Sequence, residues 1–199
     1  MTRSRQTADW GSRAGLAKIV PSSVAVGSGT GSASALGTVT FTGVSSLSIN
    51  DVFSSTYDNY LLVINFNSHS ALDKDIRLRM RVSGSDESSA QYFEQYVAFT
   101  NANATDNFRT AGGTSFFCST LDSPTTGAFY STEYVLRNPF ATSATTMFNR
   151  INGINNSTGN ITTYHGGGVL NTTLSYTGFS FVISQGTVTG TISILGYTQ

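Results

Sequence analysis

Apolar and polar residues alternate with a period of two along most of the chain after residue 36. The clearest run covers residues 76–82, in which every second residue is apolar and the three between them are Arg77, Arg79 and Arg81. Side chains of a strand point alternately to its two faces, so this run predicts a strand with one face in a core and arginines on the other. Residues 60–66 are almost continuously apolar, which is typical of a strand in the middle of a sandwich.

The same pattern predicts about ten short strands in all. The others span residues 37–42, 44–49, 91–99, 114–118, 128–137, 146–154, 160–165, 174–183 and 187–197. Turn residues separate them, and Gly166, Gly167 and Gly168 are interpreted as one of these turns. Helical spacing of apolar residues is absent, and strands joined by short turns cannot form a parallel sheet. We therefore predict an all-β fold: an antiparallel two-sheet sandwich, jelly-roll-like, with an extended N-terminal arm.

The first 35 residues lack this alternation and are predicted to lie outside the sandwich, which is expected to span residues 36–199. Residues 1–20 are predicted to form an anchoring arm, because their few apolar side chains cannot form a core on their own. The residues expected to contact another protein are Trp10, Arg13, Leu16, Lys18, Ile19 and Val20. Residues 21–35 are rich in Gly and Ser and are predicted to form a flexible or extended spacer, with at most a short strand at 24–26.

The composition indicates one folded domain rather than a disordered chain. The 199 residues include 13 Phe and 9 Tyr, whereas charged residues make up only 11%. The formal net charge is zero, so the chain as a whole generates no field that favours nucleic acid. No apolar run has the roughly 20 residues that a membrane helix requires, and no secretion signal follows the N-terminal arginines. We therefore expect neither a nucleic-acid partner nor membrane insertion.

Residue types that carry catalysis or bind metals are scarce. His69 and His165 lack the Cys or carboxylate spacing of a zinc site, and no nucleophile motif accompanies them. Cys118, the single cysteine, lies in an apolar run, which favours a small buried side chain and excludes an intrachain disulfide. The oxygen-rich loop around Asp106 is an alternative calcium site, but its low carboxylate density favours a solvated loop. We expect no catalytic residue, no metal and no cofactor.

Two glutamates leave a choice between ion pairing and catalysis. Glu94 and Glu133 each lie in a predicted strand, and a pair of carboxylates facing a cleft is the arrangement that hydrolyses glycosidic bonds. The arginines of residues 76–82 repel one another unless acids stand on a neighbouring strand. Ion pairing is therefore favoured for both glutamates, with a subunit contact and catalysis as alternatives.

A glycan site is a further alternative near residues 92–108. An aromatic face covers a sugar ring, and neighbouring amide and carboxylate groups hydrogen-bond its hydroxyl groups. The candidate residues are Tyr92, Tyr96, Asn101, Asn103, Asp106 and Phe108. Alternation along a strand places about half of these aromatic rings in the core, so a core role is favoured over sugar binding.

Five segments spread over most of the chain resemble one class of known proteins. They are Trp10-Gly-Ser-Arg-Ala-Gly-Leu-Ala-Lys-Ile-Val-Pro-Ser-Ser-Val-Ala-Val-Gly-Ser-Gly-Thr-Gly, Gly37-Thr-Val-Thr-Phe-Thr-Gly-Val-Ser-Ser-Leu-Ser-Ile, Phe53-Ser-Ser-Thr-Tyr-Asp-Asn-Tyr, Arg79-Met-Arg-Val-Ser-Gly and Gly186-Thr-Val-Thr-Gly-Thr-Ile-Ser-Ile-Leu-Gly-Tyr. In these segments the chain resembles small virion structural proteins of tailed bacteriophages, of the tail-fibre, head-fibre or decoration type. The resemblance carries no catalytic motif.

This resemblance implies a non-enzymatic virion structural protein that is made in the host cytoplasm and assembled into the particle. The N-terminal arm is then expected to bind other virion proteins, while the sandwich projects from the particle or covers it. Similar phage appendages are commonly homotrimers, which implies the same for this chain. The first alternative is a lectin-like, receptor-binding head that recognises a host surface glycan. The second is a glycoside hydrolase on the same fold.

Overall fold

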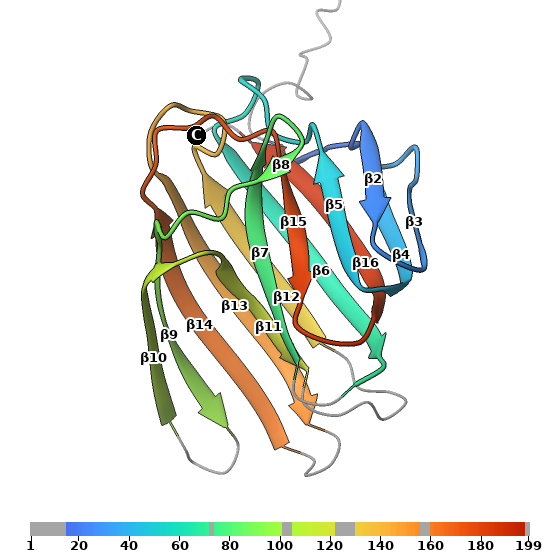
Figure 1. Ribbon diagram of the computed structural model, residues 1–199, viewed down its shortest axis with the longest axis vertical. Helices are drawn as coiled ribbons and strands as arrows, with labels where there is room; N and C mark the ends of the chain where they lie inside the picture. Colours follow the sequence, from blue (N-terminus) through green and yellow to red (C-terminus); the bar gives the residue numbers. More distant parts are fainter. Residues whose placement is uncertain (1–14, 72–73, 101–104, 122–129, 156–159, 198–199) are drawn as a thin grey trace, which may run out of the picture.

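The computed structural model describes residues 15–71, 74–100, 105–121, 130–155 and 160–197, which form two packed antiparallel sheets (Figure 1). The larger sheet has ten strands, in the order β10 (Thr105–Gly113), β9 (Tyr92–Thr100), β14 (Asn160–Leu170), β13 (Thr145–Asn155), β12 (Tyr130–Arg137), β6 (Asn59–His69), β16 (Val188–Tyr197), β4 (Thr38–Val44) and β3 (Thr30–Ala33), with β1 (Ala17–Lys18) also paired to β16. The smaller sheet has six strands, in the order β11 (Phe116–Leu121), β7 (Lys74–Val82), β15 (Gly178–Ile183), β5 (Ser46–Asn50) and β2 (Ser23–Val26), with β8 (Ser85–Asp86) paired to β7.

The predicted all-β, two-sheet sandwich is confirmed. The chain passes repeatedly from one sheet to the other, as from β4 to β5, β6 and β7, which is the winding of a jelly roll. No helix in the described ranges is long and apolar enough to cross a membrane.

The core lies between the two sheets and is built from the inward positions of alternating strands. Strand β6 contributes Leu62, Ile64 and Phe66, and β15 contributes Phe179 and Phe181 from the opposite sheet. The ring centroids of Phe66 and Phe181 lie 5.9 Å apart. Each such side chain contributes about 1.5 to 3 kcal/mol through burial, so these facing pairs hold the sheets together.

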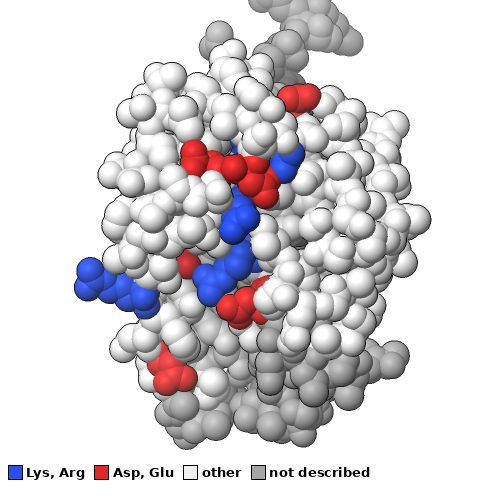
Figure 2. Space-filling model, viewed as in Figure 1, with Lys and Arg blue, Asp and Glu red and all other residues white. Residues whose placement is uncertain are grey.

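The outer face of the smaller sheet carries the predicted row of arginines. Figure 2 shows basic side chains along the middle of this face with acidic side chains next to them. Arg77 pairs with Asp75 and Glu94 at 2.9 and 3.2 Å, and Arg81 pairs with Asp86 of β8. The inward and outward positions of β7 and the ion-pair interpretation of Glu94 are both confirmed.

The N-terminal region differs from the predicted spacer. Strand β2 pairs with β5, and β3 pairs with β4, so most of residues 21–35 form edge strands of the two sheets. Gly29 lies between them with a φ of +70°, where a Cβ atom would meet the backbone oxygen of Thr42 at 2.1 Å. The glycines and serines of this segment thus permit close packing. The short strand expected at 24–26 is present as β2, whereas the sequence predicts neither β3 nor the pairing of both strands into the sheets.

Two further segments fold differently from the sequence prediction. Residues 105–113, expected as an oxygen-rich loop followed by a turn, form the edge strand β10. Gly166, Gly167 and Gly168, expected as a turn, lie inside β14 and pair with both β13 and β9. Pairing on both sides supplies the backbone hydrogen bonds of these glycines, and this tertiary effect outweighs their low strand propensity.

Candidate functional site

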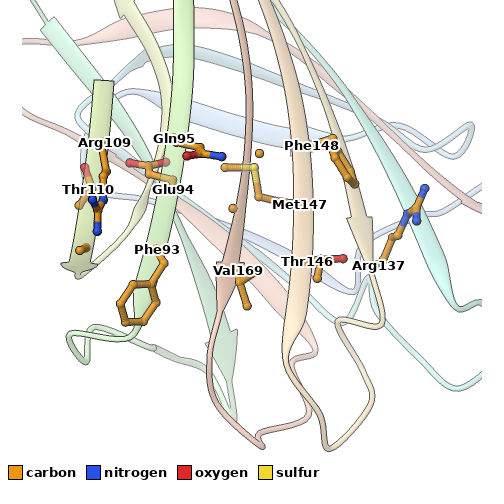
Figure 3. Close-up of a pocket in the computed structure, with 13 residues that line it drawn as sticks. Phe93, Glu94, Gln95, Arg109, Thr110, Arg137, Thr146, Met147, Phe148 and Val169 are labelled. Carbon is orange, nitrogen blue, oxygen red and sulfur yellow. The ribbon is translucent and has the colours of Figure 1, made fainter. Parts of the chain in front are cut away.

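A groove lies on the outer face of the larger sheet, over β10, β9, β14, β13 and β12. We call it the outer groove. Its volume is about 600 Å³. The side chains and backbone that line it come from Phe93, Glu94, Gln95, Arg109, Thr110, Ala111, Arg137, Thr146, Met147, Phe148, Gly167, Gly168 and Val169, most of which Figure 3 labels.

Strand alternation explains why aromatic rings stand in this groove. Glu94 and Met147 face the interior and are buried, so their neighbours Phe93 and Phe148 face outward. Phe93 is 40% exposed and Phe148 is 52% exposed, which are high values for phenylalanine in the middle of a sheet. These two rings therefore form apolar walls that solvent reaches.

Gly167 forms the part of the floor that adjoins the Phe148 wall. It lies opposite Phe148 on β13 and opposite Gln95 on β9, and it has no side chain to fill the space above the sheet. A Cβ atom at this position would make only ordinary contacts, at 3.4 Å from the Met147 backbone oxygen and 3.5 Å from the Phe148 ring. The depression therefore exists because of the missing side chain and not because of a backbone distortion.

A second hollow of about 630 Å³ adjoins the outer groove along the sheet. The two hollows share Gln95, Arg109, Phe148 and Gly167, and the second adds polar groups from Asn107 and His165. Together they offer amide, imidazole and guanidinium groups around an apolar floor and walls. This combination is typical of small-molecule sites, which are mainly apolar with a few placed polar groups.

The charges beside the outer groove are basic. Arg109 on β10 and Arg137 on β12 line opposite sides of it, as Figure 3 shows. The guanidinium carbon of Arg137 lies 5.3 Å from the centroid of the Phe148 ring, a cation–π contact that orients both groups. Within the described ranges, the ion pairs involve only Arg77 and Arg81, so no described carboxylate neutralises either groove arginine.

The glycan-site residues expected from the sequence do not form one exposed platform. Tyr92 is fully buried, and its hydroxyl group donates to the Glu87 backbone oxygen at 2.8 Å, so its ring is not available to a ligand. Tyr96 is stacked between Phe108 and Phe117, with centroid distances of 4.9 and 4.8 Å. Burial raises the pKa of Tyr96 to about 12.

The remaining members of that expected site lie at or near the edge strand β10. Phe108 is exposed, stacks one face on Tyr96 and, like Tyr96, lines the second hollow, and Asp106 is exposed. Asn101 and Asn103 lie outside the described residues. The exposed aromatic rings of the outer groove are instead Phe93 and Phe148, on the opposite face of the same sheet.

Glu94 belongs to a buried polar network around the edge strand β11. Its carboxylate accepts a 2.7 Å hydrogen bond from the backbone amide of Phe117 and the ion pair from Arg77. The Phe117 backbone oxygen accepts hydrogen bonds from the Tyr134 hydroxyl group and the Asn149 amide. Side chains of the larger sheet thus satisfy backbone groups that an edge strand would otherwise leave unpaired.

Glu94 and Glu133 do not form a carboxylate pair. Glu94 faces the interior on β9, whereas Glu133 is exposed on β12, three strand spacings or about 14 Å across the sheet. Glycosidases hold their two carboxyl groups about 5 to 9.5 Å apart on one cleft. Desolvation raises the pKa of Glu94, and the Phe117 amide and Arg77 oppose that shift.

The histidines and the cysteine, which are the other residue types suited to catalysis or metal binding, lie on three different strands. His69 and His165 lie on β6 and β14, and the described part of the chain contains no group of three or more His, Cys, Asp or Glu side chains able to hold a metal ion. Cys118 is buried and free, and burial raises the pKa of its thiol. Its environment is that of a small core side chain.

The expected anchoring residues fall into three groups. Trp10 and Arg13 lie outside the described residues. Leu16 and Val20 are 56% and 50% exposed, and Lys18 is exposed. Ile19, in contrast, packs against the core of its own sandwich, and its backbone amide donates to the Ile194 oxygen at 2.9 Å. The side chain of Ile19 therefore stabilises its own sandwich and is not free to anchor the chain to another protein.

Sequence reasoning missed the outer groove because two of its features were misassigned. Composition alone predicts a turn at the three glycines, and the period of two predicts for Phe148 only a position in a strand. A usable signal was present, since Phe93 and Phe148 occupy the alternate positions to buried residues within predicted strands. What the chain alone did not indicate is that β9 and β13 flank the glycine strand.

The sequence matches no known family model and no curated protein sequence. Among solved structures, the peanut lectin in complex with a nine-residue peptide is similar with a TM-score of 0.28 and 10% identity, over 88% of this chain and 93% of the lectin chain. The CBM2 module of the evolved Dit protein of Lactobacillus casei BL23 phage J-1 is similar with a TM-score of 0.25 and 10% identity, over 85% of this chain and 81% of that chain. Similarities at these TM-scores assign no family to the chain.

Proposed function

We propose that this protein is a non-enzymatic module of a bacteriophage particle that binds a surface saccharide in the outer groove. The observation that carries this proposal is one hollow lined by the exposed rings of Phe93 and Phe148, with the bare backbone of Gly167 beside Phe148. A sugar ring has an apolar face of C–H groups and a polar rim of hydroxyl groups. The aromatic walls match the face, and Gln95, Asn107 and the arginines match the rim.

The dimensions of the outer groove favour a small extended ligand over a folded protein partner. Its volume falls within the range of about 300 to 1,000 Å³ found for small-molecule sites. The strands that carry it are paired on both sides, with the exception of β10, so the walls are held in place before any ligand arrives. Such preorganisation lowers the entropy cost of binding.

Binding of oligosaccharides to wall variants tests this function. Phe148→Ala removes a wall and is expected to lower the affinity for a bound saccharide about tenfold, because a stacked ring contributes roughly 0.5 to 1.5 kcal/mol in addition to the apolar area that it buries. Phe99→Ala is the matched control, since Phe99 is 48% exposed but lines neither hollow. A glycan array identifies the ligand, and isothermal titration calorimetry compares the variants.

Two results would contradict the proposed saccharide site. One is the absence of binding to every saccharide on the array. The other is equal affinity of the Phe148→Ala variant and the wild type, which would place the ligand elsewhere on the molecule.

The attachment of the module to a particle is proposed from the sequence resemblance and the exposed apolar residues near the N-terminus. Leu16, Val20 and Leu36 are all at least half exposed, and Gly37, which follows Leu36, lies against the Ile19 backbone. Exposed apolar side chains such as these are suited to burial against another virion protein. Trp10 and Arg13 are proposed to take part in the same contact.

Deletion of residues 1–14 tests the attachment. It leaves β1 and Ile19 in place, so the sandwich is expected to keep its unfolding temperature while incorporation into particles is lost. A longer deletion of residues 1–20 removes β1 and is a poor test, because it also destabilises the sandwich. Normal incorporation of the 1–14 deletion, measured in purified particles, would rule out anchoring by this part of the arm.

A further inference from the structure

The charges of the residues that line the outer groove restrict the class of saccharide that it can bind. Arg109 and Arg137 line its two sides, and its one lining carboxylate, Glu94, faces the interior and is engaged by Arg77 and the Phe117 amide. Each arginine offers a planar fork of donors that matches a carboxylate. We infer that the outer groove binds an acidic oligosaccharide, whose carboxylate groups are held by Arg109 and Arg137. This inference rests on the proposed function.

The spacing of the two arginines sets the size of the ligand. They stand on β10 and β12, four strand spacings apart, which corresponds to about 19 Å across the sheet. A single sugar ring cannot reach both, so the ligand is a chain of sugars that crosses the strands. Phe93 and Phe148 lie between the two arginines, and Gly167 leaves the backbone accessible beneath the chain.

The rest of this face keeps the two arginines free for a ligand. Glu133 is an exposed carboxylate on the outer face, and it lies directly opposite Arg150 on the neighbouring strand. Arg150 lines neither hollow. An anion that enters the outer groove therefore meets two unpaired guanidinium groups and no facing carboxylate among the described residues.

The test compares matched acidic and neutral ligands. The probes are oligosaccharides that contain uronic or sialic acid, and the same oligosaccharides after esterification of their carboxyl groups, which preserves length and ring structure. Wild-type protein is expected to bind the acidic forms at least tenfold more tightly, and added salt is expected to weaken this binding because exposed charges are screened.

Arginine variants locate the charge contacts. Arg109→Gln and Arg137→Gln are each expected to lower the affinity for the acidic probe about tenfold. Arg150→Gln removes the same charge from the same face but outside the groove, and it is expected to leave the affinity unchanged. Arg109→Lys keeps the charge without the donor fork, and an intermediate loss is expected.

The outcomes separate this inference from the proposed function. Equal binding of acidic and esterified probes, with Phe148→Ala still harmful, would overturn the acidic ligand and keep the saccharide site. Absence of binding to any oligosaccharide would overturn both. Tighter binding of single-stranded DNA than of any acidic oligosaccharide, lost in Phe148→Ala, would also overturn both, because arginines and exposed rings serve nucleic acids too.

Discussion

At the scale of single residues, Glu94 shows how a buried carboxylate serves a structural purpose in this protein. It lies between the sheets, where it accepts hydrogen bonds from the Phe117 amide and from Arg77. Both partners favour the charged form, yet desolvation is the larger effect and raises the pKa. A buried ion pair of this kind adds little net stability, but removing one partner is costly.

Glu94→Gln is expected to alter the pH dependence of stability. A raised folded-state pKa means that the folded protein holds the proton more tightly than the unfolded chain. The wild type should therefore lose stability relative to Glu94→Gln as pH rises from about 4 through the raised pKa. The loss should amount to about 1.4 kcal/mol for each pKa unit of difference between the folded and unfolded states.

Urea unfolding of both proteins between pH 4 and pH 8 measures this effect. Parallel stability curves would show that burial does not shift the pKa of Glu94. A wild type that gains stability relative to the variant as pH rises would show that Arg77 and the Phe117 amide dominate over desolvation. Glu94→Ala serves as a second control, because it leaves the Phe117 amide without its acceptor.

At the scale of elements, strand β14 combines tight packing with an open surface. Alternation directs Gly166 and Gly168 to the interior and Gly167 to the outer groove. A Cβ atom at Gly166 would lie 2.6 Å from the Tyr96 Cβ atom and 2.7 Å from the Asn149 side chain, whereas the space above Gly167 is free. Glycine is thus required at position 166 because the interior is tightly packed there, whereas glycine at position 167 leaves the groove open.

Substitutions at these two glycines should have opposite consequences. Gly166→Ala is expected to lower the free energy of unfolding by about 1 to 3 kcal/mol, because the interior must shift to admit a methyl group. Gly167→Val is expected to change stability by less than about 1 kcal/mol while blocking saccharide binding, since valine suits a strand and fills the groove floor. Thermal unfolding and calorimetric titration of both variants measure the two effects.

Two results would contradict these roles of Gly166 and Gly167. Undiminished saccharide binding by a folded Gly167→Val variant would exclude the groove floor as the binding surface. A Gly166→Ala variant as stable as the wild type would show that the sheet relaxes around the added methyl group.

At the scale of the whole molecule, the two sheets differ in width. The larger sheet extends past β11, so β9 and β10 lie beyond the edge of the smaller sheet (Figure 1). The outer groove lies over these two strands and over β14, β13 and β12, on the face that the smaller sheet does not cover. The N-terminal strand β1 joins the same sheet at β16, beside the end of β4. The proposed site of attachment to the particle and the proposed saccharide site thus lie on different parts of the same sheet.

A homotrimer is predicted from the resemblance to phage appendages. Three linked grooves would raise the effective concentration at a polysaccharide surface with no new type of contact. Light scattering coupled to size-exclusion chromatography should give three times the mass of one 21.1 kDa chain. A mass of 21.1 kDa at micromolar concentration would refute a stable trimer.

The sequence alone determined the fold class and the two faces of strands such as β7, because a period of two is a local property of the chain. It did not determine that residues 21–35 form edge strands, since β2 and β3 exist through their pairing with β5 and β4. Only the tertiary structure decided the outer groove. Gly167 becomes part of a groove floor, and not of a turn, because strands distant in the sequence bring Phe148 and Gln95 to its two sides, with Phe93 opposite the nearby Val169.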